Sequence, residues 1–337
     1  MSTPTAGPSA TTASLAAPTV HPPLIGFGIV LGAAALFGML GPLSRFAYEA
    51  GMEPTAFVAW RALVALVATT AYVAWRVRRG ATRLVRPGEL SSRTRGFLLA
   101  AAIAGFTLNL FMFIAFERIT VALALLGFYT YPAMVAVVNV LLGRERLDQT
   151  RAVALALAIL GMVAVVASQL DPAGGLRLDA LGIGLALGAA VSQTVFVVVS
   201  RDGYSQVPTE QVMAVVLMVT LVGATGLAVL GGSAASVVYP LVSPSVLPIL
   251  LFTGIFAAAI PSIGFLAGIR AIGGTRAGIL MLVEPVVGVA LAAWLLGEDL
   301  VPIQLIGAAA ILAAELLLQR TAGERVGAAP TKVPGGP

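Results

Sequence analysis

The sequence predicts an all-α integral membrane protein with ten transmembrane helices, arranged as two inverted five-helix repeats. Its 337 residues are 59% hydrophobic, with a mean hydropathy of +0.99, and only 10% are charged. A soluble domain carries about 25% charged residues. Because so few charges cannot cover a water-facing surface, lipid must be the solvent for most of the chain. A repeated sequence pattern and the placement of the arginines supply the rest of this prediction.

The apolar runs have the length and character of membrane helices. A helix needs about 20 apolar residues to cross a hydrocarbon core of ~30 Å. Strands of an outer-membrane barrel would alternate in polarity, whereas these runs are continuously apolar. Ten runs qualify, at roughly 24–42, 55–75, 96–116, 121–142, 151–169, 179–199, 211–230, 246–269, 277–296 and 302–319.

Two stretches of the chain repeat one pattern. Tyr131–Leu147 reads YPAMVAVVNVLLGRERL, and Glu284–Leu300 reads EPVVGVALAAWLLGEDL. The prolines, the acid after the glycine and the final leucine match at one offset. Duplication of apolar segments is typical of secondary transporters. The duplication predicts one five-helix repeat over residues 24–170 and a second over 178–320, with disordered tails at 1–23, which holds His21, and at 321–337.

The arginines predict which side of the membrane each loop faces. Positively charged loops face the cytoplasm, and most of the arginines fall in alternate loops that share a side with both tails. Each repeat has an odd number of helices, so the second repeat enters the membrane in the opposite orientation. The richest loops carry Arg76, Arg78, Arg79, Arg83, Arg86, Arg93 and Arg95, and then Arg144, Arg146 and Arg151.

Composition excludes several functions. There is no cysteine, which removes disulfides and thiol–metal sites. The pI of about 10.1 comes from short loops between apolar runs, which indicates membrane orientation rather than nucleic-acid binding. No G-x-x-x-x-G-K-[ST] loop is present. We therefore expect no cofactor, no metal and no nucleotide as the source of energy.

The motifs resemble a known family. They are Trp60-Arg61 in the second run, a proline in the fourth and ninth runs, and the turns Gly143-Arg144-Glu145 and Gly297-Glu298. Both repeats resemble the EamA domains of the drug/metabolite transporter superfamily, and Gly273–Leu318 looks most like the threonine/homoserine exporter branch. The resemblance implies ten helices, cytoplasmic termini, a central cavity opened alternately to each side, and export of amino acids or other small metabolites.

Glu284 and Arg61 are the sharpest candidates for substrate binding or coupling, because charges inside a membrane tend to face a cavity or a partner. Glu284 lies about eight residues into its run, and its carboxyl group would suit proton exchange. A structural acid bonded to a neighbouring helix is the alternative. Arg61 could bind a substrate carboxylate with a bidentate fork, pair with Glu284, or extend to the outer interface.

A second cluster lies on the fourth run. Tyr131 occupies the place that Glu284 has in the other repeat, so any acid-based chemistry is asymmetric between the halves. Tyr129 and Tyr131 would point ~200° apart on a regular helix, and we expect only Tyr131 to face the cavity. We expect helix kinks at Pro132 and Pro285, because proline removes a backbone hydrogen bond.

Other polar groups within the runs bond between helices by default, and we expect at most two of them to touch substrate. Gln193 is the best of these, and Asn109 is a further candidate. Trp60 could stack on substrate or anchor its helix at the interface. The glycine pairs Gly28/Gly32 and Gly184/Gly188 should permit close helix packing; such faces could also join two chains, so a homodimer stays open.

Three classes of function compete. A secondary transporter of small molecules in a lipid bilayer, driven by protons or by the substrate gradient, fits best. It would export amino acids or related compounds, and the main alternative is an importer or exchanger of a sugar, nucleoside or drug. A membrane enzyme is disfavoured because no run contains histidine or a nucleophile beside a base. A receptor or scaffold does not need a duplicated core with a midplane acid.

Overall fold

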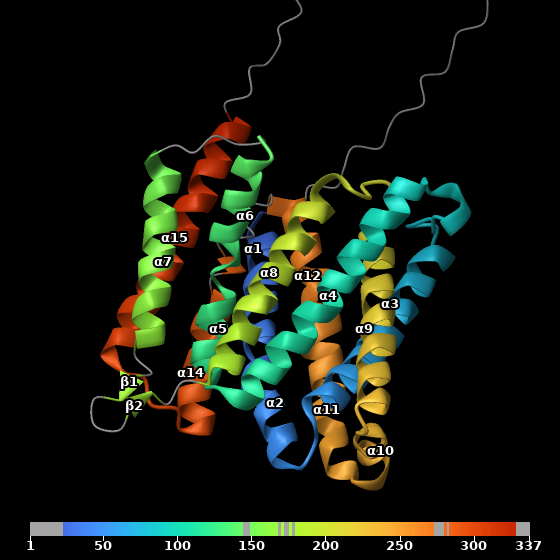
Figure 1. Cartoon of the computed structure of the whole chain (residues 1–337). Helices are drawn as coiled ribbons and strands as arrows, with labels where there is room; N and C mark the ends of the chain where they lie inside the picture. The colour runs from blue at the N-terminus through green and yellow to red at the C-terminus, as the bar shows by residue number, and fades with distance from the viewer. Residues whose placement is uncertain are drawn as a thin grey trace, which may run out of the picture.

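The protein is a bundle of helices (Figure 1). The computed structural model describes residues 23–143, 149–167, 170–171, 175–176, 179–272, 280–281 and 283–327. The predicted first tail, apart from Pro23, and Glu145 lie outside these residues. The first half contains α1 (Pro23–Gly38), α2 (Leu40–Glu49), α3 (Pro54–Arg78), η1 (Pro87–Glu89), α4 (Ser92–Arg118), α5 (Val121–Phe128), α6 (Tyr131–Leu141) and α7 (Gln149–Ala167).

A short antiparallel ribbon precedes the second half. Its strands β1 (Leu170–Asp171) and β2 (Gly175–Leu176) have two residues each, and Leu170 pairs with Leu176. α15 continues to Gly327, past the end expected at residue 320. The elements of this half are α8 (Ala180–Asp202), α9 (Thr209–Leu230), α10 (Ala234–Val242), η2 (Pro244–Val246), α11 (Leu247–Gly254), the π-helical η3 (Ile255–Ala259), α12 (Ile260–Ile272), α14 (Val283–Leu296) and α15 (Pro302–Gly327).

Seven helices in the described part are long and apolar enough to cross a membrane, which makes this a multi-pass membrane protein. They are Ile25–Glu49, Pro54–Arg78, Ser92–Arg118, Val121–Leu141, Ala180–Ser200, Thr209–Leu230 and Pro244–Phe265. The expected runs 151–169, 277–296 and 302–319 correspond to shorter apolar helices, Ala152–Gly161, Val283–Leu296 and Pro302–Ala314. Parts of the first two runs lie outside the described residues. The count of ten spans therefore stays a prediction.

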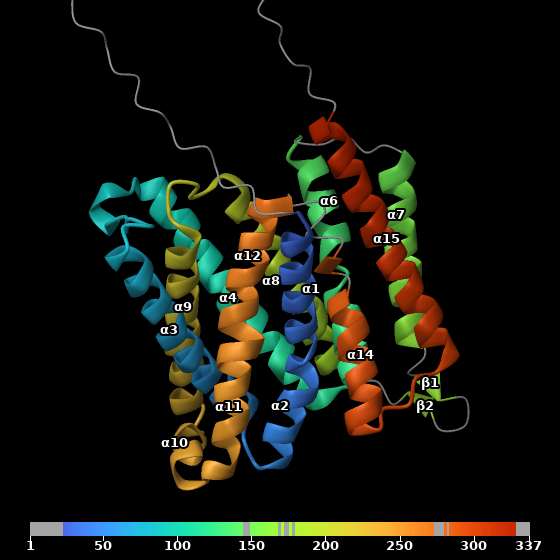
Figure 2. The ribbon, with the colours of Figure 1, turned by 180° about the vertical axis from the view of Figure 1, so that it is seen from behind.

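The two halves interlock. α1 packs against α12 and α14, as Figure 2 shows from behind, while α4 packs against α8, and α8 also contacts α5 and α6. Each contact has an equivalent when the two halves are superposed in order. The contact of α1 with α12 is equivalent to that of α8 with α4, and the contact of α1 with α14 is equivalent to that of α8 with α5 and α6. α3 with α9 and α7 with α15 each exchange into themselves. The packing thus has the two-fold pattern that a duplicated chain produces.

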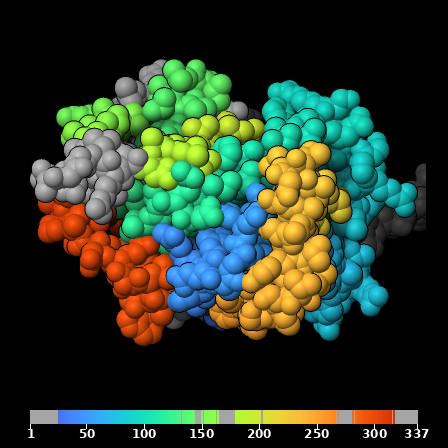
Figure 3. Space-filling model, turned by 60° about the horizontal axis from the view of Figure 1, so that its bottom comes forward, coloured from blue at the N-terminus to red at the C-terminus, as the bar shows by residue number. Residues whose placement is uncertain are grey.

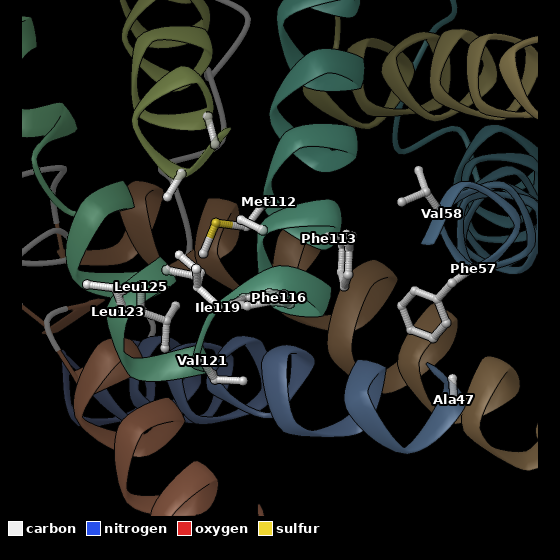
Figure 4. Close-up of a cluster of buried hydrophobic side chains, with 14 of the residues drawn as sticks. Ala47, Phe57, Val58, Met112, Phe113, Phe116, Ile119, Val121, Leu123 and Leu125 are labelled. Carbon is white, nitrogen blue, oxygen red and sulfur yellow. The ribbon is translucent and has the colours of Figure 1, made fainter. Parts of the chain in front are cut away.

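The core lies at the end of the bundle that carries α2 and α10. Its buried side chains include Phe57 and Val58 of α3, Phe113 and Phe116 of α4 and Val121 of α5 (Figure 4). At this end the blue residues of α2 lie between the gold of α10–α11 and the orange-red of α14 (Figure 3). Residues from both halves therefore close this end of the molecule.

Polar contacts tie the halves together at the same end. The Glu298 carboxylate accepts hydrogen bonds from the N–H groups of Val121 at 2.8 Å and Ala122 at 3.3 Å. This carboxylate caps α5 of the other half, where unpaired helix N–H groups favour an anion. The acid of the Gly297-Glu298 turn thus bridges the two halves.

A second tie joins α4 to α8. The Asp179 carboxylate lies 2.8 Å from the Arg118 guanidinium and caps α8 by accepting from the Gly182 N–H. The hydrogen bond from Gly182, together with Arg118, holds the pKa of Asp179 below its usual value. Asp179 therefore stays ionised through the physiological pH range, and this tie persists there.

Of the four glycines expected at close helix contacts, Gly188 alone makes one. A Cβ at Gly28, Gly32 or Gly184 would meet nothing within 4 Å, whereas one at Gly188 would lie 3.0 Å from the Phe111 ring. Other glycines make closer contacts; at Gly38, for example, a Cβ would lie 2.7 Å from the Glu284 carbonyl oxygen. Small residues lie at helix interfaces as expected, but spacing alone does not show which face of α1 meets a neighbour.

We predict that Gly38→Ala destabilises the protein by roughly 1–3 kcal/mol, because the new methyl group overlaps the backbone of α14. Gly28→Ala, on the same helix, is the matched control, since its methyl group enters open space. The measurement is the apparent unfolding temperature of each purified variant in detergent. Equal unfolding temperatures for the two variants would show that α1 and α14 do not pack as described.

Candidate functional site

A cavity of about 320 Å³ lies between the two halves. Ligand sites in proteins have volumes of about 300–1,000 Å³ and mostly apolar walls with a few placed polar groups. This cavity fits that description. Its charged and polar lining side chains are Arg61, Asn109, Tyr129, Tyr131, Gln193, Ser262 and Glu284.

The sequence analysis had singled out most of these polar residues. Arg61, Asn109, Tyr131, Gln193 and Glu284 come from α3, α4, α6, α8 and α14, and the fold brings all five to one cavity. Their shared position gives the cavity a cation at Arg61 and an acid at Glu284.

Arg61 is buried, with 4% of its surface exposed. One guanidinium nitrogen, Nη2, donates to Oδ1 of Asn109, and the guanidinium lies over the Phe113 ring at 4.7 Å from the ring centre. The buried Nε has no hydrogen-bond partner. No described carboxylate forms a salt bridge with Arg61. A buried cation in this state has unused capacity to bind an anion.

Asn109 holds Arg61 in place. Its amide nitrogen donates to the Gly105 carbonyl, one turn earlier on α4, at 2.7 Å. That bond leaves the amide oxygen free to accept from Arg61. The asparagine therefore fixes the direction of the guanidinium without neutralising its charge.

Glu284 lies in the first turn of α14, because that helix begins at Val283. Part of the run before Val283 lies outside the described residues, so the expected depth of about eight residues stays a prediction. The side chain is partly buried on the cavity wall, and Tyr129 is within hydrogen-bonding reach of its carboxyl group. The backbone oxygen of Glu284 lies against Gly38, so α1 fixes the position of this residue.

Both Tyr129 and Tyr131 line the cavity, which makes the expectation of a single cavity-facing tyrosine wrong. That expectation assumed about 100° of rotation per residue on a regular helix. The chain instead leaves the helix after Phe128 and begins α6 at Tyr131. The break turns the two rings to the same side, with their centres 6.0 Å apart.

The prolines lie at helix starts. Pro132 is in the first two positions of α6, and Pro285 is in the first turn of α14. Proline fits a first turn because its missing N–H would have no intrahelical partner there. The interruption next to Pro132 falls at Tyr129 and Thr130, before the proline rather than after it.

Other candidates lie outside the cavity lining. The Trp60 ring nitrogen donates to the Val237 carbonyl at 2.7 Å, which ties α3 to α10. Trp60 lies on a different face of α3 from Arg61, because the side chains of neighbouring residues on a helix point ~100° apart. Ser192 and Thr194 bond to carbonyls of their own helix and to Thr107 and Tyr131. Gln193, between them, is on the cavity wall.

The sequence analysis missed the aromatic wall. Eight rings line the cavity, and they come from five of the predicted runs with one to three rings in each, so no single run has a recognisable stripe. Ser262 also lines the cavity. The rings are Phe37, Phe113, Phe116, Phe128, Tyr129, Tyr131, Phe196 and Phe265.

A multi-pass helical bundle with a ligand-sized central cavity is the architecture of a membrane transporter. The family model "EamA-like transporter family" matches residues 24–167 and 180–319. The chain belongs to the EamA-like transporter family, within the drug/metabolite superfamily, whose members are transporters and not enzymes.

Two further comparisons bear on the fold. A solved structure titled "Crystal structure of protein" is similar to this chain with a TM-score of 0.59 and 20% sequence identity, over 90% of this chain and 99% of the other. At that identity the likeness shows the fold alone. No curated protein matches the chain.

Proposed function

We propose that the protein exports small polar metabolites, principally amino acids or related compounds, across the cell membrane by alternating access. Family membership supports transport of a small molecule through a bilayer. The cavity supports a polar substrate, because it carries a buried cation and an acid from opposite halves. A site built by both halves is remade whenever the halves move against each other, as alternating access requires.

The observation that carries this proposal is the state of Arg61. A buried arginine without an acidic partner among the described residues is costly unless an anion joins it. Arg61 lines the cavity and its Nε has no hydrogen-bond partner, and both observations support a bound anion at the guanidinium. We assign to Arg61 the binding of a substrate carboxylate, with Asn109 as the residue that positions it.

Glu284 is the group that we propose for coupling to protons. Its carboxyl group lies on the cavity wall beside Tyr129, where the movement of substrate and the transfer of a proton can be linked. Tyr131 and Gln193 shape the same cavity. Trp60 supports the position of α3 through its bond to α10. The resemblance to the threonine/homoserine branch stays a hypothesis about ancestry.

We propose that both termini face the cytoplasm. The described ends of the chain, in α1 and α15, lie at the same end of the bundle as the arginine-rich turn between α3 and α4 (Figure 2). Arg78, Arg79, Arg83 and Arg86 are exposed there. This arrangement agrees with the positive-inside rule and with inverted repeats in an inner membrane.

Export is tested in cells that express wild type, Glu284→Gln or Arg61→Gln and that have been loaded with a mixed amino-acid pool. We expect wild type to release particular amino acids, and both variants to lose about tenfold or more of that release, because each loses a charged contact. Release is followed by mass spectrometry with and without a protonophore. Loss of release with the protonophore is the result expected of proton coupling.

Glu49→Gln and Arg78→Gln are the controls, since both residues are exposed and outside the cavity lining. Protein levels in the membrane are compared for all variants. If wild-type cells release no amino acid beyond empty-vector cells, the substrate class fails. Uptake or exchange of a sugar, nucleoside or drug is then tested with the same variants.

Orientation is tested by cysteine tagging, since the native chain has no cysteine. Ala81→Cys and Ala235→Cys are matched because both alanines are exposed and lie at opposite ends of the bundle. We expect an impermeant thiol reagent to label Ala235→Cys in intact cells, and Ala81→Cys only after the cells are opened. Labelling of Ala81→Cys from outside would contradict the arrangement.

A further inference from the structure

The cavity wall is rich in aromatic rings, and Arg61 is the one positively charged side chain among its described lining residues. Besides the eight rings, its apolar lining includes three methionines, Met112, Met213 and Met281. Methionine sulfur makes favourable contacts with ring edges and fills irregular space. A flat apolar group therefore meets suitable contacts on several sides of this cavity.

Three of the rings form one cluster. The Phe128 ring centre lies 5.4 Å from that of Tyr129 and 5.3 Å from that of Tyr131, at interplanar angles of 86° and 36°. These are the separations at which aromatic rings attract one another. All three rings lie on the cavity wall around the break between α5 and α6, and Tyr129 is within hydrogen-bonding reach of the Glu284 carboxyl group.

The positive charge in the cavity comes from α3 rather than from the helices that carry the three rings. Among the described lining residues, Arg61 is the one that carries a positive charge. Its guanidinium is already fixed by Asn109 and by the Phe113 ring. A carboxylate that binds there meets an arginine whose direction is already set, and the rest of the ligand would extend along the apolar lining of the same cavity.

A small hydroxylated amino acid such as threonine fits these walls poorly. On binding, its hydroxyl group would lose its contacts with water and face a mainly apolar and aromatic wall. A buried hydroxyl group without a hydrogen-bond partner is costly. A ring-bearing ligand would bury its apolar surface against the same wall, which is favourable. The composition of the wall thus favours a ring-bearing ligand over threonine, a choice that the family resemblance does not make.

We infer that the substrate is a carboxylate that bears an aromatic ring, with its carboxylate on Arg61 and its ring against Phe128, Tyr129 and Tyr131. This inference rests on the proposed function and names the substrate class of the same cavity. The carboxylate requires Arg61, and the ring requires the aromatic cluster. The two requirements are separable by experiment because different residues supply them.

The test is ligand binding to the purified full-length protein, measured by the shift in its unfolding temperature and by titration. The probes are phenylalanine, 3-phenylpropionate, phenethylamine and threonine. We expect 3-phenylpropionate to bind at least about tenfold tighter than phenethylamine, because the arginine contact is lost. Phenylalanine should bind at least about tenfold tighter than threonine, because threonine buries no ring.

Variants assign the two ends of the ligand. Arg61→Gln should weaken 3-phenylpropionate about tenfold or more, and Arg78→Gln should leave it unchanged. Phe128→Leu should weaken phenylalanine about 2- to 10-fold while leaving threonine unaffected. Glu49→Gln, which is exposed and outside the cavity lining, should bind phenylalanine as wild type does. A variant is compared only if its unfolding temperature without ligand matches that of wild type.

Several results would overturn the inference. Threonine binding as tightly as phenylalanine removes the ring requirement, and phenethylamine binding as tightly as 3-phenylpropionate removes the carboxylate requirement. Binding of none of the four probes overturns the substrate class. The proposed export function is judged separately, by the release of any solute from expressing cells relative to empty-vector cells.

Discussion

Hydrocarbon offers no hydrogen-bond partner, and this constraint accounts for where the unusual features of the chain lie. Irregular backbone at membrane depth is tolerated where protein or a water-filled cavity covers it. The break between α5 and α6 places Tyr129 and Tyr131 on the cavity, and the π-helical segment Ile255–Ala259 contributes Ala258 and Ala259 to the same wall. Helix interruptions and polar side chains therefore gather at one place, and that place is the site.

The same constraint gives Arg61 its importance. The chain keeps a guanidinium buried and held by an uncharged amide, although an acid lies on the wall of the same cavity. An Arg61–Glu284 pair would neutralise both charges and close the site to an anion. The described residues show no such pair, which agrees with the proposal that Arg61 binds the substrate and that Glu284 carries a proton.

Composition and repeat pattern were enough to predict a helical membrane protein with a duplicated core. They also selected Arg61 and Glu284, because a charge within an apolar run is conspicuous. An interruption was expected at Pro132, but its position at Tyr129 and Thr130, and the direction in which it turns the two tyrosine rings, were not predicted. The aromatic wall was not predicted either, because its rings come from several helices and only tertiary packing brings them together. Gly38 was missed because its contact depends on α14, which is remote in sequence.

The central claim is that Arg61 binds a carboxylate inside the cavity. The most direct measurement is an experimental structure of the full-length protein with 3-(4-iodophenyl)propionate, in which the iodine marks the ring. The account predicts the carboxylate within hydrogen-bonding distance of the Arg61 guanidinium and the iodine near Phe128 and Tyr131. A bound state with Arg61 paired to Glu284, or with the ligand outside the cavity, would contradict it.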